Sequence, residues 1–197
     1  MDEPIIVSAK LYIHEIFKEN SDGHDAQHSL RVYRIALKIA DSYPECNRTV
    51  VALSSLLHDV DDHKLFNTKD NMNARRFMEN QHIANDDIEQ ICEIINGVSF
   101  SKNRETAPVR IEGKIVQDAD RLDAIGAIGS IGIARTFAYG GKTGRSMESS
   151  LQHFQDKLLL LKERMNTEEA KRMAEVRHTY MEGFLLEYQK ESEGWFL

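Results

Sequence analysis

Apolar residues recur along most of the chain at spacings of three and four, which is the period of an amphipathic α-helix. This spacing predicts helices over residues 2–19, 25–42, 48–59, 70–80, about 85–97, from 108 to about 118, and about 147–164 and 167–190. Segment 48–59 is apolar on nearly every face, as expected of a helix that is buried on most sides. Alternation with a period of two, the pattern of a half-buried strand, is nearly absent. The sequence therefore predicts an all-α fold.

Residues that favour helix ends interrupt this pattern. The polar segment 20–23 ends the first predicted helix, Asn85 is expected to cap a later one, and Pro108 is expected to start the next. Thr167, after Asn166, separates the last two predicted helices. Segment 124–138 is rich in Gly, Ala and Ile, so it allows either close helix packing or a mobile edge of an active site.

Length and net charge limit the number of domains and the kinds of binding partner that the chain can have. The chain has 197 residues, of which 41% are hydrophobic and 29% charged, with a formal net charge of −7. This length fits one domain, residues 1–197, that buries a sizeable core. The acidic balance argues against broad binding of nucleic acid or of an anionic membrane. One small phosphate ligand remains possible, because it needs only a local positive site.

The cysteines and the N-terminal sequence indicate a cellular compartment. Cys46 and Cys92 are the only cysteines and form no CxxC motif, so a disulfide scaffold is excluded and a reducing compartment is expected. The start of the chain has no basic region followed by an apolar one, and no apolar run approaches the roughly 20 residues of a membrane helix. We therefore expect a soluble cytoplasmic protein.

Two stretches combine histidine with aspartate beside an apolar helix. His24 and His28 are four residues apart and share a face if the helix already runs there. His58 and Asp59 are the last two residues of the very apolar segment 48–59, where burying both groups is costly unless something compensates. A divalent cation compensates both, because imidazole and carboxylate are metal ligands. A solvated helix start and a hydrated acidic loop are the alternatives.

A third stretch, residues 118–123, carries three carboxylates after an apolar segment. Asp120 and Asp123 are three residues apart and share a helical face, whereas Asp118 points elsewhere. A surface helix with an Asp–Arg pair is the alternative interpretation, and such a pair contributes little to stability.

Together the three stretches follow the order H…HD…D, which resembles the HD-domain superfamily of metal-dependent phosphohydrolases. The resemblance is carried by HDAQHSLRV, LLHDVDDHK and QDADRLDAIGAIG, and it runs from about His24 to Arg135. It looks closest to the small stand-alone bacterial HD hydrolases, which include nucleotide pyrophosphohydrolases. It implies a helical bundle with a metal-site core over about 20–138 and a C-terminal helical extension over about 147–190.

The resemblance also implies a ligand set for one divalent metal ion. The ligands are His28, His58, Asp59 and Asp120, with Asp118 as the alternative to Asp120. Two imidazoles and two carboxylates suit Mn²⁺, Fe²⁺, Co²⁺, Ni²⁺ or Zn²⁺, and Mn²⁺ is the preferred expectation.

Further roles follow from neighbouring positions. Asp62 is the main candidate for a catalytic acid or base, ahead of Asp61, because HD hydrolases often place an acidic residue at this offset. Asp123 is a candidate to orient a water molecule or a ribose hydroxyl. The candidate substrate-binding residues are His24, Arg31, Lys64 and Arg135, each of which is otherwise an ordinary polar or charged side chain.

The implied reaction is hydrolysis of a phosphoester or phosphoanhydride bond in a nucleotide or similar small phosphate compound, by a hydroxide bound to the metal. Release of pyrophosphate from a nucleoside triphosphate is the preferred subclass. The alternatives are (p)ppGpp hydrolysis, which is disfavoured because Asp123-Ala124 stand where those enzymes usually carry His-Asn, and nucleotidase or cyclic-nucleotide phosphodiesterase activity. A non-catalytic helical sensor with a structural metal is a further alternative, and a homodimer is possible.

Overall fold

Helices joined by turns and irregular segments make up the part of the chain that its computed structural model describes, which is residues 3–18, 25–63, 65–98, 107–131 and 151–193. No residue in these ranges lies in a strand, so the predicted all-α fold is confirmed. The contacts between residues divide the chain into two compact units, Met1–Asp120 and Arg121–Leu197. No helix in the described ranges is both long and apolar enough to cross a membrane.

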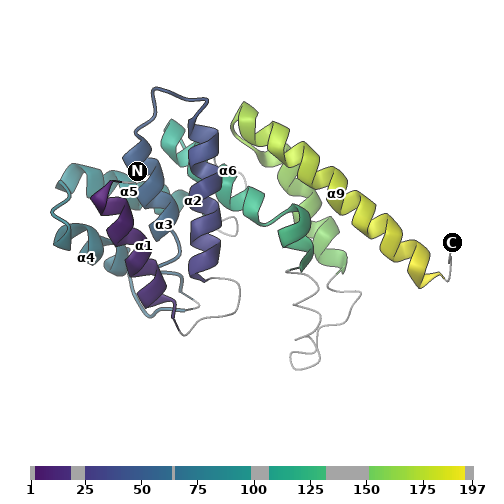
Figure 1. Ribbon diagram of the computed structural model, residues 1–197, viewed down its shortest axis with the longest axis horizontal. Coiled ribbons are helices and arrows are strands. Elements are labelled where there is room, and N and C mark those ends of the chain that lie inside the picture. The colour runs from purple at the N-terminus through teal and green to yellow at the C-terminus, as the bar shows by residue number, and fades with distance from the viewer. Residues whose placement is uncertain (1–2, 19–24, 64, 99–106, 132–150, 194–197) are drawn as a thin grey trace. The chain divides into compact units, whose positions relative to one another are not determined.

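The first unit is organised around a buried central helix. Its helices are α1 (Pro4–Ile16), α2 (Ala26–Ala40), α3 (Arg48–Leu57), α4 (Met72–Asn80), α5 (Asn85–Val98) and α6 (Ile111–Asp123), the last of which ends in the second unit. Every residue of α3 from Val50 to Leu57 is buried. Helices α1, α2 and α5 pack against it, and Figure 1 shows α3 between α1 and α2. The apolar segment of the sequence is thus the core of this unit.

Side chains outside the helices hold the starts of α2 and α3. The Oδ1 atom of Asp25 accepts a hydrogen bond of 2.8 Å from the backbone N–H of His28. The Oδ1 atom of Asn47 accepts bonds of 3.1 and 3.2 Å from the N–H groups of Thr49 and Val50. Such caps satisfy N–H groups that have no partner inside the helix, and each contributes about 1 kcal/mol.

Several helix ends differ from the sequence-based expectation. Helix α3 ends at Leu57, before the end of the predicted segment 48–59, and Asn85 is the first residue of α5 rather than its cap. Pro108 does not start α6, which begins three residues later. Pro108 instead packs against α6 at Gly113, where an added Cβ atom would lie 2.8 Å from Cβ of Pro108.

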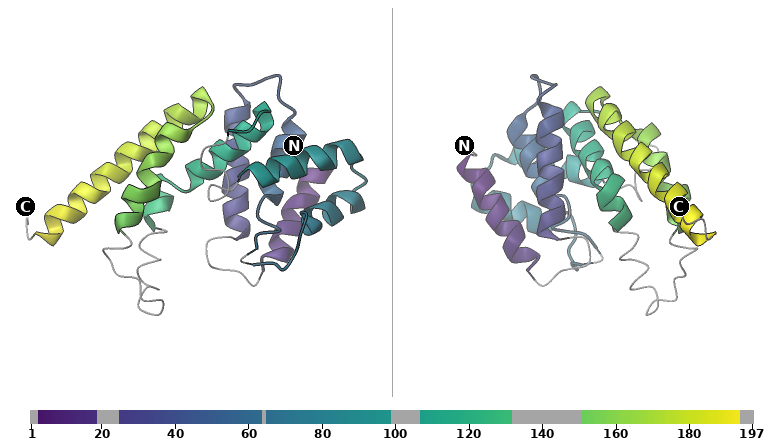
Figure 2. Two further views of the ribbon diagram at one scale, coloured as in Figure 1. Left: turned by 180° about the vertical axis from the view of Figure 1, so that it is seen from behind. Right: turned by 45° about the vertical axis from the view of Figure 1, so that its right-hand side comes forward.

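The second unit pairs a short helical segment with the long helix α9 (Glu168–Ser192). Residues 126–131 are helical, and η1 (Phe154–Leu158) is a π-helix that continues into the 3₁₀-helix η2 (Leu159–Arg164). The described part of the predicted helix 147–164 is therefore not a regular α-helix beyond residue 153. Figure 2 shows the yellow α9 beside this light green segment.

Candidate metal centre

Two histidines from different helices meet at one point in the first unit. His28 lies in the first turn of α2, and His58 directly follows α3 as its C-terminal cap. Their Nε2 atoms are 3.1 Å apart, and their rings meet edge to face with an interplanar angle of 64°. The meeting point follows from the packing of α2 against α3.

The backbone determines which nitrogen of His58 faces His28. The Nδ1 atom of His58 lies 2.8 Å from the carbonyl oxygen of Ser55. A carbonyl oxygen only accepts hydrogen bonds, so Nδ1 carries the proton in the neutral ring. The Nε2 atom of His58 then presents a lone pair, and the side chain is only 3% exposed. A metal-binding histidine typically donates the N–H of its other ring nitrogen in this way, which orients the ring toward the metal.

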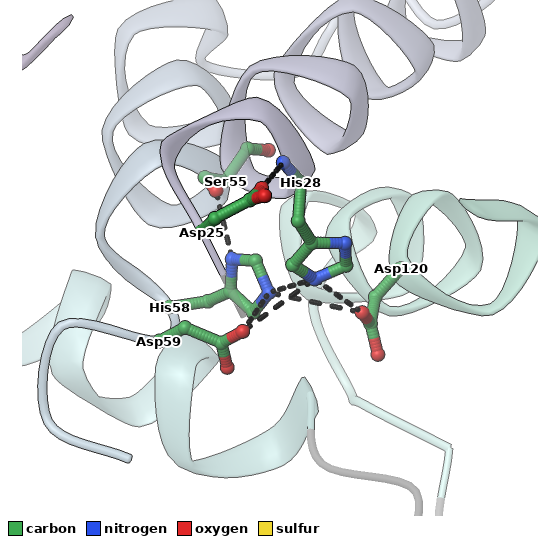
Figure 3. A network of polar contacts seen from close by, with 6 residues as sticks. All are labelled: Asp25, His28, Ser55, His58, Asp59 and Asp120. Carbon is green, nitrogen blue, oxygen red and sulfur yellow. Dashed lines mark hydrogen bonds and ion pairs between the residues drawn. The ribbon is translucent and has the colours of Figure 1, made fainter. Parts of the chain in front are cut away.

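Two carboxylates approach the same point, as Figure 3 shows. The Oδ2 atom of Asp59 lies 3.5 Å from the Nε2 atoms of both His28 and His58. The Oδ1 atom of Asp120 lies 3.4 Å from Nε2 of His28 and 3.7 Å from Nε2 of His58. One ligand atom from each of His28, His58 and Asp120 lies within 4.8 Å of the other two.

The chemistry of these four side chains fits a divalent cation. Carboxylate oxygens only accept, and His58 turns a lone pair toward them, so electron pairs converge on a shared point. A proton on one imidazole satisfies part of this arrangement, whereas a cation attracts all four groups at once. Two imidazoles and two carboxylates suit Mn²⁺, Fe²⁺, Co²⁺, Ni²⁺ or Zn²⁺. His28, His58, Asp59 and Asp120 would hold such an ion.

Asp118 and Asp120 occupy different environments on α6. Residues two apart on a helix point in nearly opposite directions, so only one of these carboxylates faces a given neighbour. Asp118 is completely buried, whereas the Asp120 side chain is 23% exposed and its Oδ1 atom approaches both histidines. In the described part of the chain, the cluster of ligand atoms within 4.8 Å of one another contains Asp120 and neither Asp118 nor Asp59. Asp59 nevertheless reaches both histidines, because its Oδ2 atom lies 3.5 Å from each Nε2 atom.

The two acidic residues that follow Asp59 have separate surroundings. Asp61 accepts hydrogen bonds of 2.9 and 3.0 Å from the N–H groups of Asn73 and Ala74 at the start of α4. Asp62 lies in the turn after α3 with its side chain 18% exposed, and its Oδ1 atom is 3.9 Å from Nδ1 of His63. Both oxygens of Asp61 are thus engaged by backbone donors.

The remaining predicted site residues are spread over the two units. Arg31 is partly buried on α2, one turn after His28. Asp123 is 4% exposed and belongs to the second unit, where it lies near Arg177. Burial lowers the pKa of the Arg177 guanidinium, and the charge of Asp123 opposes this shift. His24, Lys64 and Arg135 lie outside the described residues.

Sequence reasoning missed three contributors to this region. Asp25 caps the N-terminus of α2, because its side chain accepts a hydrogen bond from the backbone N–H of His28. An Asp just before a helical pattern is a recognised signal for such a cap. Asn73 donates from its side chain to the carbonyl oxygen of Val60, which no local motif indicates. The contribution of Ser55 comes from its backbone carbonyl, so its side chain carries no signal.

Comparison with known proteins agrees with this geometry. The HD domain family matches residues 25–125, a range that contains all four proposed ligands. YpgQ from Bacillus subtilis, a protein described as uncharacterized, is 35% identical over 198 residues, covering 94% of this chain and 92% of YpgQ.

Solved structures extend the similarity to nearly the whole length. The crystal structure of an HD-superfamily hydrolase from Bacillus thuringiensis is 39% identical and covers 95% of this chain and 96% of that one, with a TM-score of 0.77. The crystal structure of B. subtilis YpgQ in complex with ADP is 31% identical in the matched region and covers 95% of this chain and 94% of that one, with a TM-score of 0.79. The chain therefore belongs to the HD-domain family and is a metal-dependent hydrolase of the HD superfamily.

Proposed function

We propose that the chain hydrolyses a phosphoester or phosphoanhydride bond in a nucleotide, with one divalent cation held by His28, His58, Asp59 and Asp120. The observation that carries this proposal is that one oxygen of Asp59 and one of Asp120 each lie 3.4 to 3.7 Å from both histidine Nε2 atoms, which are themselves 3.1 Å apart. The ligands come from three helical regions that are distant in sequence, so chance proximity along the chain does not explain their meeting.

The partial burial of the site strengthens its electrostatic effects. The side chains of His28, Asp59 and Asp120 are 12%, 13% and 23% exposed, so one side of the centre remains open to a substrate. When bound there, a divalent cation lowers the pKa of water and polarises a phosphoryl oxygen. His58 keeps its lone pair directed into the site because Ser55 holds its Nδ1 proton.

Asp62 is the proposed acid or base beside this centre. It follows Asp59 by three residues, and its main chain is held in place because its carbonyl oxygen accepts bonds of 2.9 and 2.8 Å from the N–H groups of Leu65 and Phe66. Its carboxylate accepts a proton from the attacking water or returns one to the leaving group. Arg31 is the proposed phosphate contact, because it shares a helical face with His28.

A nucleotide is the proposed substrate class. The relative YpgQ has been crystallised in complex with ADP, and it matches this chain over nearly its whole length. Within this class, release of pyrophosphate from a nucleoside triphosphate is the reaction we propose first. Hydrolysis of other nucleotide phosphates uses the same ligands and differs in where the leaving group lies.

Phosphorus NMR tests the proposal directly. The full-length chain is freed of metal, supplied with Mn²⁺ and incubated with nucleoside triphosphates, diphosphates and cyclic monophosphates. We expect pyrophosphate and a nucleoside monophosphate from a triphosphate, and no product after addition of a chelator. Asp41→Asn is the matched control, because Asp41 pairs with Arg48 on the surface with its side chain 53% exposed.

Two results contradict the proposal in different ways. Bound Mn²⁺ without turnover of any phosphate compound indicates a non-catalytic helical module with a structural metal. Inorganic phosphate as the only product places the chain among nucleotidases or related phosphatases and removes the pyrophosphohydrolase assignment.

A further inference from the structure

Asp61 connects the segment after α3 to the start of α4. Its Oδ1 atom accepts a hydrogen bond of 2.9 Å from the N–H of Asn73, and its Oδ2 atom accepts one of 3.0 Å from the N–H of Ala74. These are N–H groups of the first turn of α4, which have no partner inside the helix. The residue before α4, Asn71, has a left-handed backbone (φ 56°) and makes no side-chain cap. Asp61 therefore supplies the cap from ten residues earlier in the chain.

A second hydrogen bond joins the same two segments. The Nδ2 atom of Asn73 donates to the carbonyl oxygen of Val60 at 2.7 Å. Val60 is completely buried. Two consecutive residues after Asp59, namely Val60 and Asp61, are thus held by the first turn of α4.

The start of α4 is itself held by other helices. The hydroxyl of Tyr12 on α1 donates to the carbonyl oxygen of Asn73 at 3.2 Å, and the Tyr12 ring stacks on Phe77 with centroids 4.8 Å apart. On the other side, Arg75 makes two hydrogen bonds of 2.5 and 2.8 Å to Glu89 of α5. The first turn of α4 is therefore a fixed point between α1 and α5.

Asp59 depends on this fixed point more than the other proposed ligands do. His28 and Asp120 lie within helices, and Ser55 orients His58. Asp59 lies beyond the end of α3, in a turn where its carbonyl oxygen accepts a bond of 3.0 Å from the N–H of Asp62. A carboxylate in a turn keeps its direction only if the following main chain is held.

We propose that Asp61 is a positioning residue, which holds the turn after α3 so that the carboxylate of Asp59 faces the metal centre. The proposal rests on the proposed function, because it assigns to Asp59 the role of a metal ligand. Asp61 does not itself accept the substrate's proton, since both of its oxygens are engaged by N–H groups of α4. The acid–base role falls to Asp62 in the same turn.

Two variants test the Asp61 bonds to α4 and the Asn73 bond to Val60 one at a time. Asp61→Asn replaces one accepting oxygen by an NH₂ group that meets an N–H donor, so it breaks one of the two bonds to α4. Asn73→Ala removes the bond to Val60 and leaves the N–H groups that Asp61 accepts from. The matched control is Thr167→Ala, because the Thr167 hydroxyl caps α9 in the second unit by accepting from Ala170 at 3.3 Å.

The measurements are the dissociation constant for Mn²⁺, by titration calorimetry on folded protein, and hydrogen exchange of residues 58–62 in the metal-free chain. We expect Asp61→Asn to weaken Mn²⁺ binding by about 10- to 100-fold, as for loss of a group that orients a ligand. Asn73→Ala is expected to act in the same direction with a smaller effect. Both variants should exchange faster over residues 58–62, whereas Thr167→Ala should lower the melting temperature without either effect.

Three results overturn the inference. Unchanged Mn²⁺ affinity in Asp61→Asn, with lost stability alone, shows a simple helix cap. Unchanged affinity with a lower kcat shows a catalytic group instead. If Asp61→Asn does not fold, Asn73→Ala serves in its place. Wild-type Mn²⁺ affinity and wild-type hydrogen exchange over residues 58–62 in that variant also overturn the inference. Wild-type protein that binds Mn²⁺ and hydrolyses nothing contradicts the proposed function alone, because the affinity and exchange comparisons do not depend on turnover.

Discussion

The Nδ1 atom of His58 lies 2.8 Å from the carbonyl oxygen of Ser55, one turn earlier along the chain. This contact selects the tautomer of His58 before any ligand arrives, so the lone pair on Nε2 already faces His28. This lone pair and the oxygens of Asp59 and Asp120 all favour a positive charge at the point where they meet. The folded chain therefore gains stability from any cation that it binds at this point.

Metal binding should raise the free energy of unfolding in proportion to the logarithm of the free metal concentration, once that concentration exceeds the dissociation constant. At a free Mn²⁺ concentration of about 100 times the dissociation constant, we expect a gain of about 2.7 kcal/mol in the free energy of unfolding. Differential scanning calorimetry with and without Mn²⁺ measures this gain, and a chelator should reverse it. Mg²⁺ is the control ion, because it prefers oxygen ligands and should stabilise the chain far less. Equal stabilisation by Mg²⁺ contradicts the proposal that His28 and His58 are metal ligands.

Substitution of the two aspartates on α6 distinguishes the metal ligand from its neighbour. Asp120→Asn should weaken Mn²⁺ binding by about 100-fold or more, because it removes a charged ligand. Asp118→Asn should leave the Mn²⁺ affinity of the folded protein within a few-fold and act on stability, since Asp118 is completely buried. Calorimetric titration of both variants gives the comparison. The reverse pattern makes Asp118 the ligand.

Replacement of the proposed acid or base should separate catalysis from metal binding. Asp62→Asn is expected to lower kcat by about 10²- to 10⁴-fold, the range for loss of a general acid or base. The Mn²⁺ dissociation constant should stay within a few-fold of the wild-type value. Steady-state kinetics together with metal titration test this expectation. A loss of metal binding in Asp62→Asn instead places Asp62 among the ligands.

The stability of the chain should fall in alkaline solution partly through Tyr12. Burial, and to a smaller extent the charge of Asp61, raise the pKa of Tyr12 from 10.0 to about 12. The unfolded chain thus loses this proton at lower pH than the folded one, so the contribution is complete below pH 10 and is lost as the pH rises toward 12. Tyr12→Phe should show a smaller decline over that range, measured by urea unfolding at several pH values. If the stability of the wild type and of Tyr12→Phe falls equally over this pH range, Tyr12 is not a source of the alkaline loss.

Two glycines of the second unit should respond to alanine in opposite directions. Gly126 has φ 78°, and a Cβ atom there would lie 3.1 Å from Cβ and Cγ of Arg177. Gly126→Ala should therefore cost about 1–3 kcal/mol, since it adds left-handed strain and crowding. Gly183 lies within α9 with nothing within 4 Å of such a Cβ, so Gly183→Ala should stabilise by up to about 1 kcal/mol. Chemical denaturation of both variants measures the contrast.

Periodicity along the chain predicted the fold class because helical spacing is a local property. The apolar run at Val50–Leu57 correctly indicated a helix buried on most sides, and Thr167 was correctly placed at the start of the last helix. The π-helix and 3₁₀-helix after residue 153 were not predicted. Phe154, Leu158 and Leu161 are all buried at spacings of four and three, which an α-helix shows equally well.

The histidines and aspartates of the site were singled out by residue type and order, and their meeting was expected only through the family resemblance. The structure brings His28, His58, Asp59 and Asp120 together, while their roles as ligands remain a prediction. The contacts that orient them could not be predicted, because the carbonyl of Ser55 and the N–H groups of Asn73 and Ala74 belong to the main chain. Every residue except proline carries the same backbone donor and acceptor, so their use leaves little mark in the sequence.

The burial of α3 from Val50 to Leu57 links the evolution of the site to that of the core. His58 and Asp59 directly follow a helix whose residues from Val50 to Leu57 have no face toward solvent. A substitution that enlarges or shrinks one of these side chains must shift α3 against α1, α2 or α5, and His58 shifts with it. Adaptation to a new substrate is therefore easier at an exposed position such as His63, whose side chain is 68% exposed, than within the helix before His58.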